Sequence, residues 1–297
     1  MHDHAAHERM QRLTDIALMC GAVLCFALLD TTAKYLNLHM STLQVVWARY
    51  TGAFLFPFMF SNPWTRPQLL VTARPVLQIA RSVLLHSSTL CNFAALRYLQ
   101  LDEAIALVFS TPFFVAALSG PILGEWVHWR RWTAIAVGFL GVLVVTRPGF
   151  ASFHPAALFS LSSAGFYALY SIMTRILART DSNATTLFYS NLVGAVALIP
   201  ALPFIWTKPT NALVIGLMIG TGAAGGFGHY LLIAAHRLAP AAVLSPFIYT
   251  EIVWVSLLGF LVFRDLPSRW TLAGAAIVIG SGLYLFYRER AVRAKKK

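Results

Sequence analysis

The chain has 297 residues, of which 58% are hydrophobic and only 11% are charged, and its mean hydropathy is +0.67. These values lie outside the soluble globular range and leave no stretch polar enough to cover a soluble catalytic domain. The net charge of +12 would suit nucleic-acid binding, but six basic residues crowd the last ten positions, RERAVRAKKK, where they would face anionic lipid headgroups. The composition predicts an all-α integral membrane protein that contacts lipid and not nucleic acid.

Ten apolar segments are candidates to cross the bilayer, which takes about 20 residues. The first is expected to be a retained helix and not a signal peptide, because no clear small-residue cleavage site follows it. A mobile polar tail is expected at 1–15 and a basic tail at 288–297. The ten segments are 16–36, 43–60, 76–96, 103–123, 132–147, 156–176, 185–206, 213–235, 240–263 and 270–287.

The distribution of basic residues predicts the orientation. With the amino terminus in the cytoplasm, 15 Lys and Arg residues fall inside and 6 outside, as the positive-inside rule requires. We therefore expect a multi-pass protein of the bacterial inner membrane with both termini in the cytoplasm. The three cysteines, Cys20, Cys25 and Cys91, lie in apolar runs, so neither a disulfide framework nor a metal site is expected.

The second half of the chain repeats the first. The triplet RWT at 131–133 recurs at 269–271, and ALLDTTAKYL at 27–36 aligns with ALYSIMTRIL at 168–177. These matches predict two five-helix repeats, at 16–149 and 150–287. Because five is an odd number, the second copy enters the membrane from the opposite side, and carriers built from such inverted repeats usually hold cargo at the repeat interface.

These features resemble the drug/metabolite transporter superfamily, specifically its EamA-type members. The resemblance rests on the five-plus-five duplication, on a basic residue that ends the first helix of each half (AKYL, TRIL), and on WARY in helix two and GEW at 124–126. The sequence departs from the pattern at FRD (263–265), where GE would be expected, and at Asp30 in place of a neutral polar residue. The resemblance implies a secondary transporter, from a family that consists largely of exporters and includes amino-acid exporters.

Segment 76–96 carries a polar stripe. Ser82, His86, Thr89 and Asn92 recur at steps of four, three and three, which places them on one helix face. Such a face is expected to point into the bundle, either toward a watery cavity or toward hydrogen bonds with neighbouring helices. His86 stands out because its size and its titration near neutral pH suit cargo contact or proton exchange.

Glycine and proline mark two further segments. Gly216, Gly220, Gly222 and Gly226 are spaced for close helix packing, although the glycines beside His229 and Tyr230 would also let the backbone bend next to a substrate. Pro112 and Pro246 each free a carbonyl four residues earlier, which predicts kinks that either flank the binding region or only shape packing.

Glu251 lies at the midpoint of the predicted span 240–263. An exposed charge there would cost at least about 2.5 kcal/mol, so the side chain must turn inward, pair with Arg49 or Arg81, or take up a proton. Low dielectric favours the neutral acid, which makes Glu251 a candidate proton carrier and substrate ligand. Asp30 and Lys34, four residues apart, are expected to pair with each other.

The predicted substrate site combines these positions with aromatic side chains that would hold an ammonium group by cation–π attraction. It comprises Ser82, His86, Thr89, Asn92, Tyr170, His229, Tyr249 and Glu251.

No nucleotide-binding, HExxH or GxSxG motif occurs, so an enzyme is disfavoured, and no cofactor or metal is expected. The sequence thus predicts a secondary exporter of amino acids or similar small amphiphilic metabolites that works by alternating access. Two alternatives stay open: an exporter of drugs, quaternary ammonium compounds or sugars, and a non-transporting membrane scaffold or enzyme subunit. The oligomeric state is also open, with a monomer included.

Overall fold

The computed structural model describes residues 2–58, 63–124, 129–147, 154–238 and 247–294. All regular structure in these ranges is helical, and the predicted all-α fold is confirmed. Five apolar helical stretches are long enough to cross a membrane: Ile16–Asn37, Leu101–Leu123, Ala157–Leu177, Asn183–Ile205 and Ala212–Leu232. The elements are α1 (His2–Asn37), α2 (Thr42–Phe58), η1 (Pro67–Leu70), α3 (Pro75–Leu96), α4 (Leu101–Val108), α5 (Thr111–Leu123), α6 (Trp129–Thr146), α7 (Ala157–Leu177), α8 (Asn183–Ala197), η2 (Ile199–Ala201), α9 (Leu202–Ile205), α10 (Ala212–Leu238), α12 (Glu251–Leu258), η3 (Gly259–Phe263) and α13 (Arg269–Ala294).

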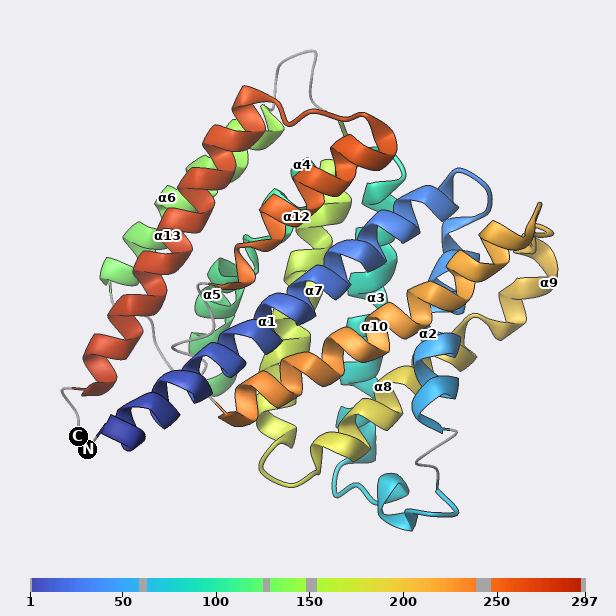
Figure 1. Cartoon of the computed structure of the whole chain (residues 1–297), viewed down its shortest axis with the longest axis horizontal. Coiled ribbons are helices and arrows are strands. Elements are labelled where there is room, and N and C mark those ends of the chain that lie inside the picture. Colours follow the sequence, from blue (N-terminus) through green and yellow to red (C-terminus); the bar gives the residue numbers. More distant parts are fainter. Residues whose placement is uncertain (1, 59–62, 125–128, 148–153, 239–246, 295–297) are drawn as a thin grey trace.

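Each half of the chain packs on the other through equivalent helices. The first helix of one half packs on the third helix of the other half twice over, as α1 on α10 and as α7 on α3. The second helices pack in the same reciprocal way, α2 on α10 and α8 on α3, and the last helices, α6 and α13, run side by side (Figure 1). This reciprocity is what two inverted five-helix repeats produce.

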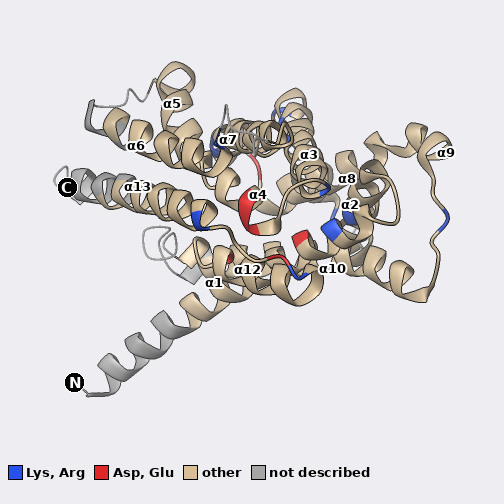
Figure 2. Cartoon of the chain, turned by 90° about the horizontal axis from the view of Figure 1, so that it is seen from above, with Lys and Arg blue, Asp and Glu red and all other residues tan. Residues whose placement is uncertain are grey.

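Both ends of the chain lie at the same end of the bundle, where α1 begins and α13 finishes (Figure 1). Figure 2 shows few charged positions along the helices and places the acidic ones toward the middle, around α4 and α12. Large hydrophobic residues such as Phe56, Phe139 and Ile219 are exposed on the outside. Apolar outer faces are what the hydrocarbon core of a bilayer requires. α1 begins at His2, so the helix runs through most of the segment that was predicted to be a mobile tail, and α13 continues into the predicted basic tail as far as Ala294.

The predicted span 103–123 is broken into α4 and α5 at Phe109 and Ser110, just before Pro112. The carbonyl of Val108, which Pro112 cannot bond, accepts a hydrogen bond of 2.7 Å from the hydroxyl of Thr111. The hydroxyl of Ser110 likewise donates to the carbonyl of Leu107 at 2.7 Å. Side-chain hydroxyls therefore satisfy the backbone at a break inside the membrane.

The predicted span 240–263 is described only in its second half. Residues 247–248 are helical, 249–250 form a turn and α12 begins at Glu251, so this carboxylate lies at a helix N-terminus. A helix N-terminus attracts negative charge, which favours a carboxylate at this position. Pro246 lies outside the described residues.

Glycine allows α2 and α10 to touch backbone to backbone. A Cβ atom placed on Gly52 would lie 2.8 Å from the Cα of Gly222, and one on Gly222 would lie 2.9 Å from the amide nitrogen of Ala53. A Cβ atom placed on Gly228 would lie 2.9 Å from the ring of Phe26, so this glycine makes room for a side chain of α1. By contrast, Gly216 has no atom within 4 Å of where its Cβ would stand, so its spacing to Gly220 does not report a helix contact.

We expect Gly222→Ala to destabilise the protein by about 1–3 kcal/mol, because the added methyl group forces α10 away from α2. Thermal unfolding of the purified protein in detergent measures this effect. Gly216→Ala is the matched control on the same helix; its methyl group meets open space, so stability should stay the same or rise by up to about 1 kcal/mol through helix propensity. Equal unfolding temperatures for the two variants would contradict the contact.

Asp181, in the connection between α7 and α8, ties together the segments at one end of the bundle. Its carboxylate accepts hydrogen bonds from the Thr72 hydroxyl, from the Gln78 amide at 2.8 Å and from the backbone amide of Ala73 at 3.2 Å. Burial alone would raise the pKa of Asp181, but these hydrogen bonds together hold the pKa below its usual value.

Because the folded protein lowers this pKa, the stability that Asp181 contributes is present above about pH 4 and is lost as the pH falls through the lowered pKa. We therefore expect Asp181→Asn to unfold at a lower temperature than the wild type at pH 7, with the difference shrinking toward pH 3. Unfolding curves of both proteins across this range test the expectation. A difference that stayed constant with pH would show that the carboxylate charge is not what matters.

Candidate functional site

A cavity of about 560 Å³ lies inside the bundle, between the two halves. Its walls come from both halves, chiefly from α1, α3, α5, α7, α10 and α12. The lining residues of α1 run from Met19 to Asp30, and those of α10 are His229 and Leu232, near the end of that helix. The cavity therefore occupies the middle of the bundle and the half toward the chain termini. The volume suits one small molecule.

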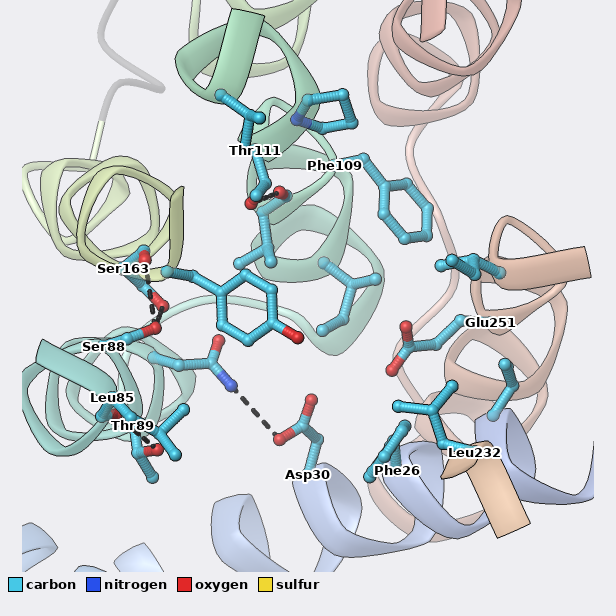
Figure 3. Close-up of a pocket in the computed structure, with 18 of the residues that line it drawn as sticks. Phe26, Asp30, Leu85, Ser88, Thr89, Phe109, Thr111, Ser163, Leu232 and Glu251 are labelled. Atoms are coloured by element: carbon cyan, nitrogen blue, oxygen red, sulfur yellow. Dashed lines mark hydrogen bonds between the residues drawn. The ribbon is translucent and has the colours of Figure 1, made fainter. Parts of the chain in front are cut away.

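Asp30 is a charged residue in the cavity wall and is only 7% exposed. One carboxylate oxygen accepts a hydrogen bond of 3.1 Å from the side-chain amide of Asn92 on α3. Figure 3 shows this bond and shows that Asp30 points from α1 into the cavity. The amide oxygen of Asn92 is buried and has no hydrogen-bond partner among the described residues.

Glu251 lies opposite Asp30. The two carboxylates point from α12 and α1 into the same space (Figure 3), and the charge of Asp30 acts on Glu251. Glu251 forms no hydrogen bond or ion pair with the residues that the structure describes. A carboxylate in this position is available to a ligand.

Arg49 of α2 supplies the opposite charge. Its side chain is 7% exposed, lies over the ring of Tyr50 at 4.5 Å and lines the same cavity. Its Nε is buried without a hydrogen-bond partner within the described part of the chain. Arg49 acts electrostatically on Asp30 without a direct ion pair, since the only ion pair among the described residues joins Lys34 to Asp265. Arg175 also borders the cavity, but its side chain is exposed near the end of α7.

The rest of the wall is mainly apolar and aromatic. Phe26 packs edge-on against His229 with ring centres 5.1 Å apart, and Phe109 packs in the same way against Tyr249 at 5.2 Å. Tyr167 also lines the cavity. Such surfaces favour flat or apolar parts of a ligand, and their faces attract cations.

Two hydrogen bonds tie α3 to its neighbours beside the cavity. Ser88 and Ser163 of α7 are bonded hydroxyl to hydroxyl at 3.0 Å, as Figure 3 shows, and Tyr50 of α2 bonds Thr89 at 2.8 Å. The polar stripe predicted on this helix is therefore partly used for helix contacts.

The structure brings together five of the eight residues predicted to bind substrate. Those that line the cavity are Thr89, Asn92, His229, Tyr249 and Glu251. The other three lie outside its wall. Ser82 donates to the carbonyl of Gln78 at 2.7 Å, His86 is buried beside Tyr50 at a ring distance of 5.2 Å, and Tyr170 packs on Arg81 and Tyr167.

Arg81 is buried with neutral partners. It donates to the hydroxyl of Thr174 at 3.1 Å, to the carbonyl of Thr186 at 2.8 Å and to the hydroxyl of Ser190, and it lies over the ring of Tyr170 at 4.8 Å. Arg81 therefore joins α3 to α7 and α8, and it forms no ion pair with Glu251.

The expected pairing of Asp30 with Lys34 is wrong. The Lys34 ammonium instead bonds Asp265 at 2.9 Å and the carbonyl of Leu99 at 2.9 Å, and it lies 4.8 Å from the ring centre of Phe263. Asp265 belongs to FRD, where the sequence departs from the family pattern. Asp265 is thus the ion-pair partner of Lys34, and Asp30 lines the cavity without an ion pair to Lys34. This cluster joins α1 to the segments around Leu99 and Asp265 at the end of the bundle away from the chain termini (Figure 1).

Sequence reasoning missed the cavity roles of Asp30 and Arg49. The signal was the same as for Glu251: each is a charge inside an otherwise apolar run. Asp30 was assigned to Lys34 because the two are one helical turn apart, and Arg49 was considered only as an ion-pair partner. Phe26 and Phe109 gave no signal, since aromatic residues are common along every segment.

A multi-pass helical membrane protein with a charged cavity between inverted repeats has the architecture of a secondary transporter. The chain belongs to the EamA-like transporter family: the sequence pattern of that family matches twice, at residues 13–147 and 154–287. Its function is therefore transport and not enzymatic catalysis. The boundaries predicted for the two repeats, 16–149 and 150–287, stay a prediction.

Several curated proteins are similar to the chain over most of its length. An S-adenosylmethionine uptake transporter of Rickettsia bellii is 29% identical over 90% of this chain and 91% of its own. A riboflavin transporter of Vibrio cholerae is 28% identical over 90% of this chain and 91% of its own. A pseudopaline exporter of Pseudomonas aeruginosa is 28% identical over 64% of this chain and 67% of its own.

The fold is also found among solved structures. One crystal structure of a protein with 17% sequence identity superposes with a TM-score of 0.61 and covers 94% of this chain and 98% of its own. At this identity the likeness supports the fold alone.

Proposed function

We propose that the chain carries a small metabolite with an amino-acid group across the membrane, with S-adenosylmethionine as the leading candidate. The observation that carries this proposal is the presence of buried charges of both signs, Arg49 beside Asp30, on one cavity between the repeats. The sequence predicts amino acids and similar amphiphilic metabolites as cargo, and the charged cavity supports this class.

Arg49 is suited to the carboxylate of the cargo. A guanidinium presents a planar set of donors that matches a carboxylate, and Arg49 forms no ion pair in the described part of the chain. Burying an arginine within a membrane protein is costly unless it is paired. A cargo carboxylate would supply the missing partner.

Asp30 is suited to the ammonium group of the same cargo. In an amino acid the ammonium and carboxylate groups are attached to one carbon atom, so their partners must lie near each other. Asp30 and Arg49 meet this requirement, because they interact electrostatically and line the same cavity. Asn92 holds the Asp30 carboxylate in place and offers a free amide oxygen as a second acceptor.

The apolar wall is suited to the remainder of the cargo. Phe26, Phe109 and Tyr249 present ring surface to the cavity, where a heterocycle such as adenine can pack. Riboflavin would also fill this surface, but it carries no charge and would leave Asp30 and Arg49 without partners. The charged wall therefore favours an amino-acid derivative over a flavin.

The route is alternating access by movement of one repeat against the other. We propose inward movement, because the proteins that are similar over nine-tenths of the chain include one named for uptake. Export, which the family resemblance led us to expect, is the other outcome of the test. Placement in a bacterial inner membrane with both termini in the cytoplasm is part of the proposal and is supported by the distribution of basic residues.

The purified protein in liposomes should take up labelled S-adenosylmethionine in competition with unlabelled ligand. We expect Arg49→Gln to weaken binding about 10- to 100-fold, because the cargo carboxylate loses a charged partner. S-adenosylmethionine lacking its carboxyl group is the matched ligand, and it should bind wild type and Arg49→Gln alike. Riboflavin transport without S-adenosylmethionine transport would refute the proposed cargo, and loading labelled ligand inside the liposomes measures export.

Proton coupling through Glu251 stays a prediction. If Glu251 exchanges a proton during the cycle, an imposed pH gradient should change the rate of uptake several-fold in the wild type. The same gradient should have no effect on Glu251→Gln, which cannot lose a proton. A wild-type rate that does not respond to the gradient would remove the proton-carrier role and leave the transport proposal intact.

A further inference from the structure

We propose that Glu251 selects the cargo by binding a second cationic centre, separate from the amino-acid group. The preferred cargo would then carry two positive charges and one negative charge, as a sulfonium or aminated amino acid does. This inference rests on the proposed function, since it takes Arg49 and Asp30 as the partners of the amino-acid group.

Glu251 is available for such a role. Its carboxylate has no hydrogen bond or ion pair with any described residue, and Figure 3 shows it directed into the cavity. The only positive side chain buried in the cavity wall is Arg49 among the residues that the structure describes. One arginine cannot compensate both Asp30 and Glu251 when both carboxylates are ionised, so the ionised form of Glu251 requires a further cation.

Glu251 comes from a different helix than Arg49 and Asp30, the pair that would hold the amino-acid group. Arg49 acts on Asp30, whereas the charge that acts on Glu251 is that of Asp30. Glu251 lies on α12, which packs against α1, and its carboxylate faces that of Asp30 (Figure 3). A cargo that bridges the cavity can therefore place one charged end at Arg49 and Asp30 and a second positive centre at Glu251.

The surroundings of Glu251 favour a cation without hydrogen-bond donors. Tyr249 is two residues away and packs against Phe109, and Tyr167 is close enough for the charge of Glu251 to act on it. All three rings line the cavity. A carboxylate among aromatic faces can hold a sulfonium or quaternary ammonium group, which binds by charge and by cation–π attraction.

The number of charges on the cargo decides whether Glu251 has a partner. A cargo with two cationic centres and one carboxylate gives a partner to each of the three buried charges, Asp30, Glu251 and Arg49. A neutral amino acid leaves Glu251 unpaired. The inference therefore predicts discrimination between two ligands that differ by a single charge.

S-adenosylmethionine and S-adenosylhomocysteine form such a pair, because the second lacks only the methyl group and the positive charge on sulfur. Their dissociation constants should be measured by calorimetry on the purified wild type and on Glu251→Gln. We expect the wild type to bind S-adenosylmethionine at least about tenfold more tightly. In Glu251→Gln this ratio should fall to about one, with the affinity for S-adenosylhomocysteine unchanged, which also shows that the variant is folded.

Two further variants sharpen the result. Glu251→Asp keeps the charge and should retain part of the preference. Glu103→Gln makes the same chemical change at a carboxylate outside the cavity wall and should leave the ratio as it is in the wild type. Equal wild-type affinities for the two ligands, or a preference that survives in Glu251→Gln, would overturn the inference. If the wild type binds neither ligand, the proposed function itself fails.

Discussion

The structure depends on the cost of placing a charge or an open hydrogen-bonding group in hydrocarbon. Some of the charged side chains within the bundle are held by partners from other segments. Lys34 meets Asp265, and Arg81 meets hydroxyl, carbonyl and aromatic partners from two helices. Against this background the incompletely matched charges of Asp30, Arg49 and Glu251 are conspicuous, and they all face one cavity. The same constraint that orders the bundle therefore marks the place where a polar ligand belongs.

The two halves have the same helix arrangement but differ in their charged residues. Their helices pack reciprocally, α1 on α10 and α7 on α3, so the cavity is formed by equivalent elements from each repeat. At the offset that aligns the first helices, however, Asp30 corresponds to Ser171, and at the offset of the last helices Glu251 corresponds to Phe113. The carboxylates are thus single additions to a duplicated frame. A binding site of low symmetry can recognise a cargo whose two ends differ.

The sequence was enough to predict the helices and the duplication, because long apolar runs and an odd number of spans per repeat leave few alternatives. It was not enough for the pairing of charges. Lys34 was assigned to Asp30, four residues away, whereas its partner Asp265 is 231 positions distant. Spacing rules describe neighbours on one helix and carry no information on which helices meet. For the same reason the stripe on α3 was placed correctly on one face, but the structure was needed to show that Asn92 reaches the cavity while Ser82 bonds its own helix.

The contacts of Lys34 also bear on what the protein does when it has no cargo. One ammonium group joins α1 to Asp265, to the carbonyl of Leu99 and to the ring of Phe263, so the three segments can separate only if all of these contacts are lost together. These contacts favour the arrangement of the bundle that the structure describes. Because a ligand shifts a conformational equilibrium only by its difference in affinity for the two states, a cargo that bound both states equally would leave the contacts of Lys34 in place, however tightly it bound.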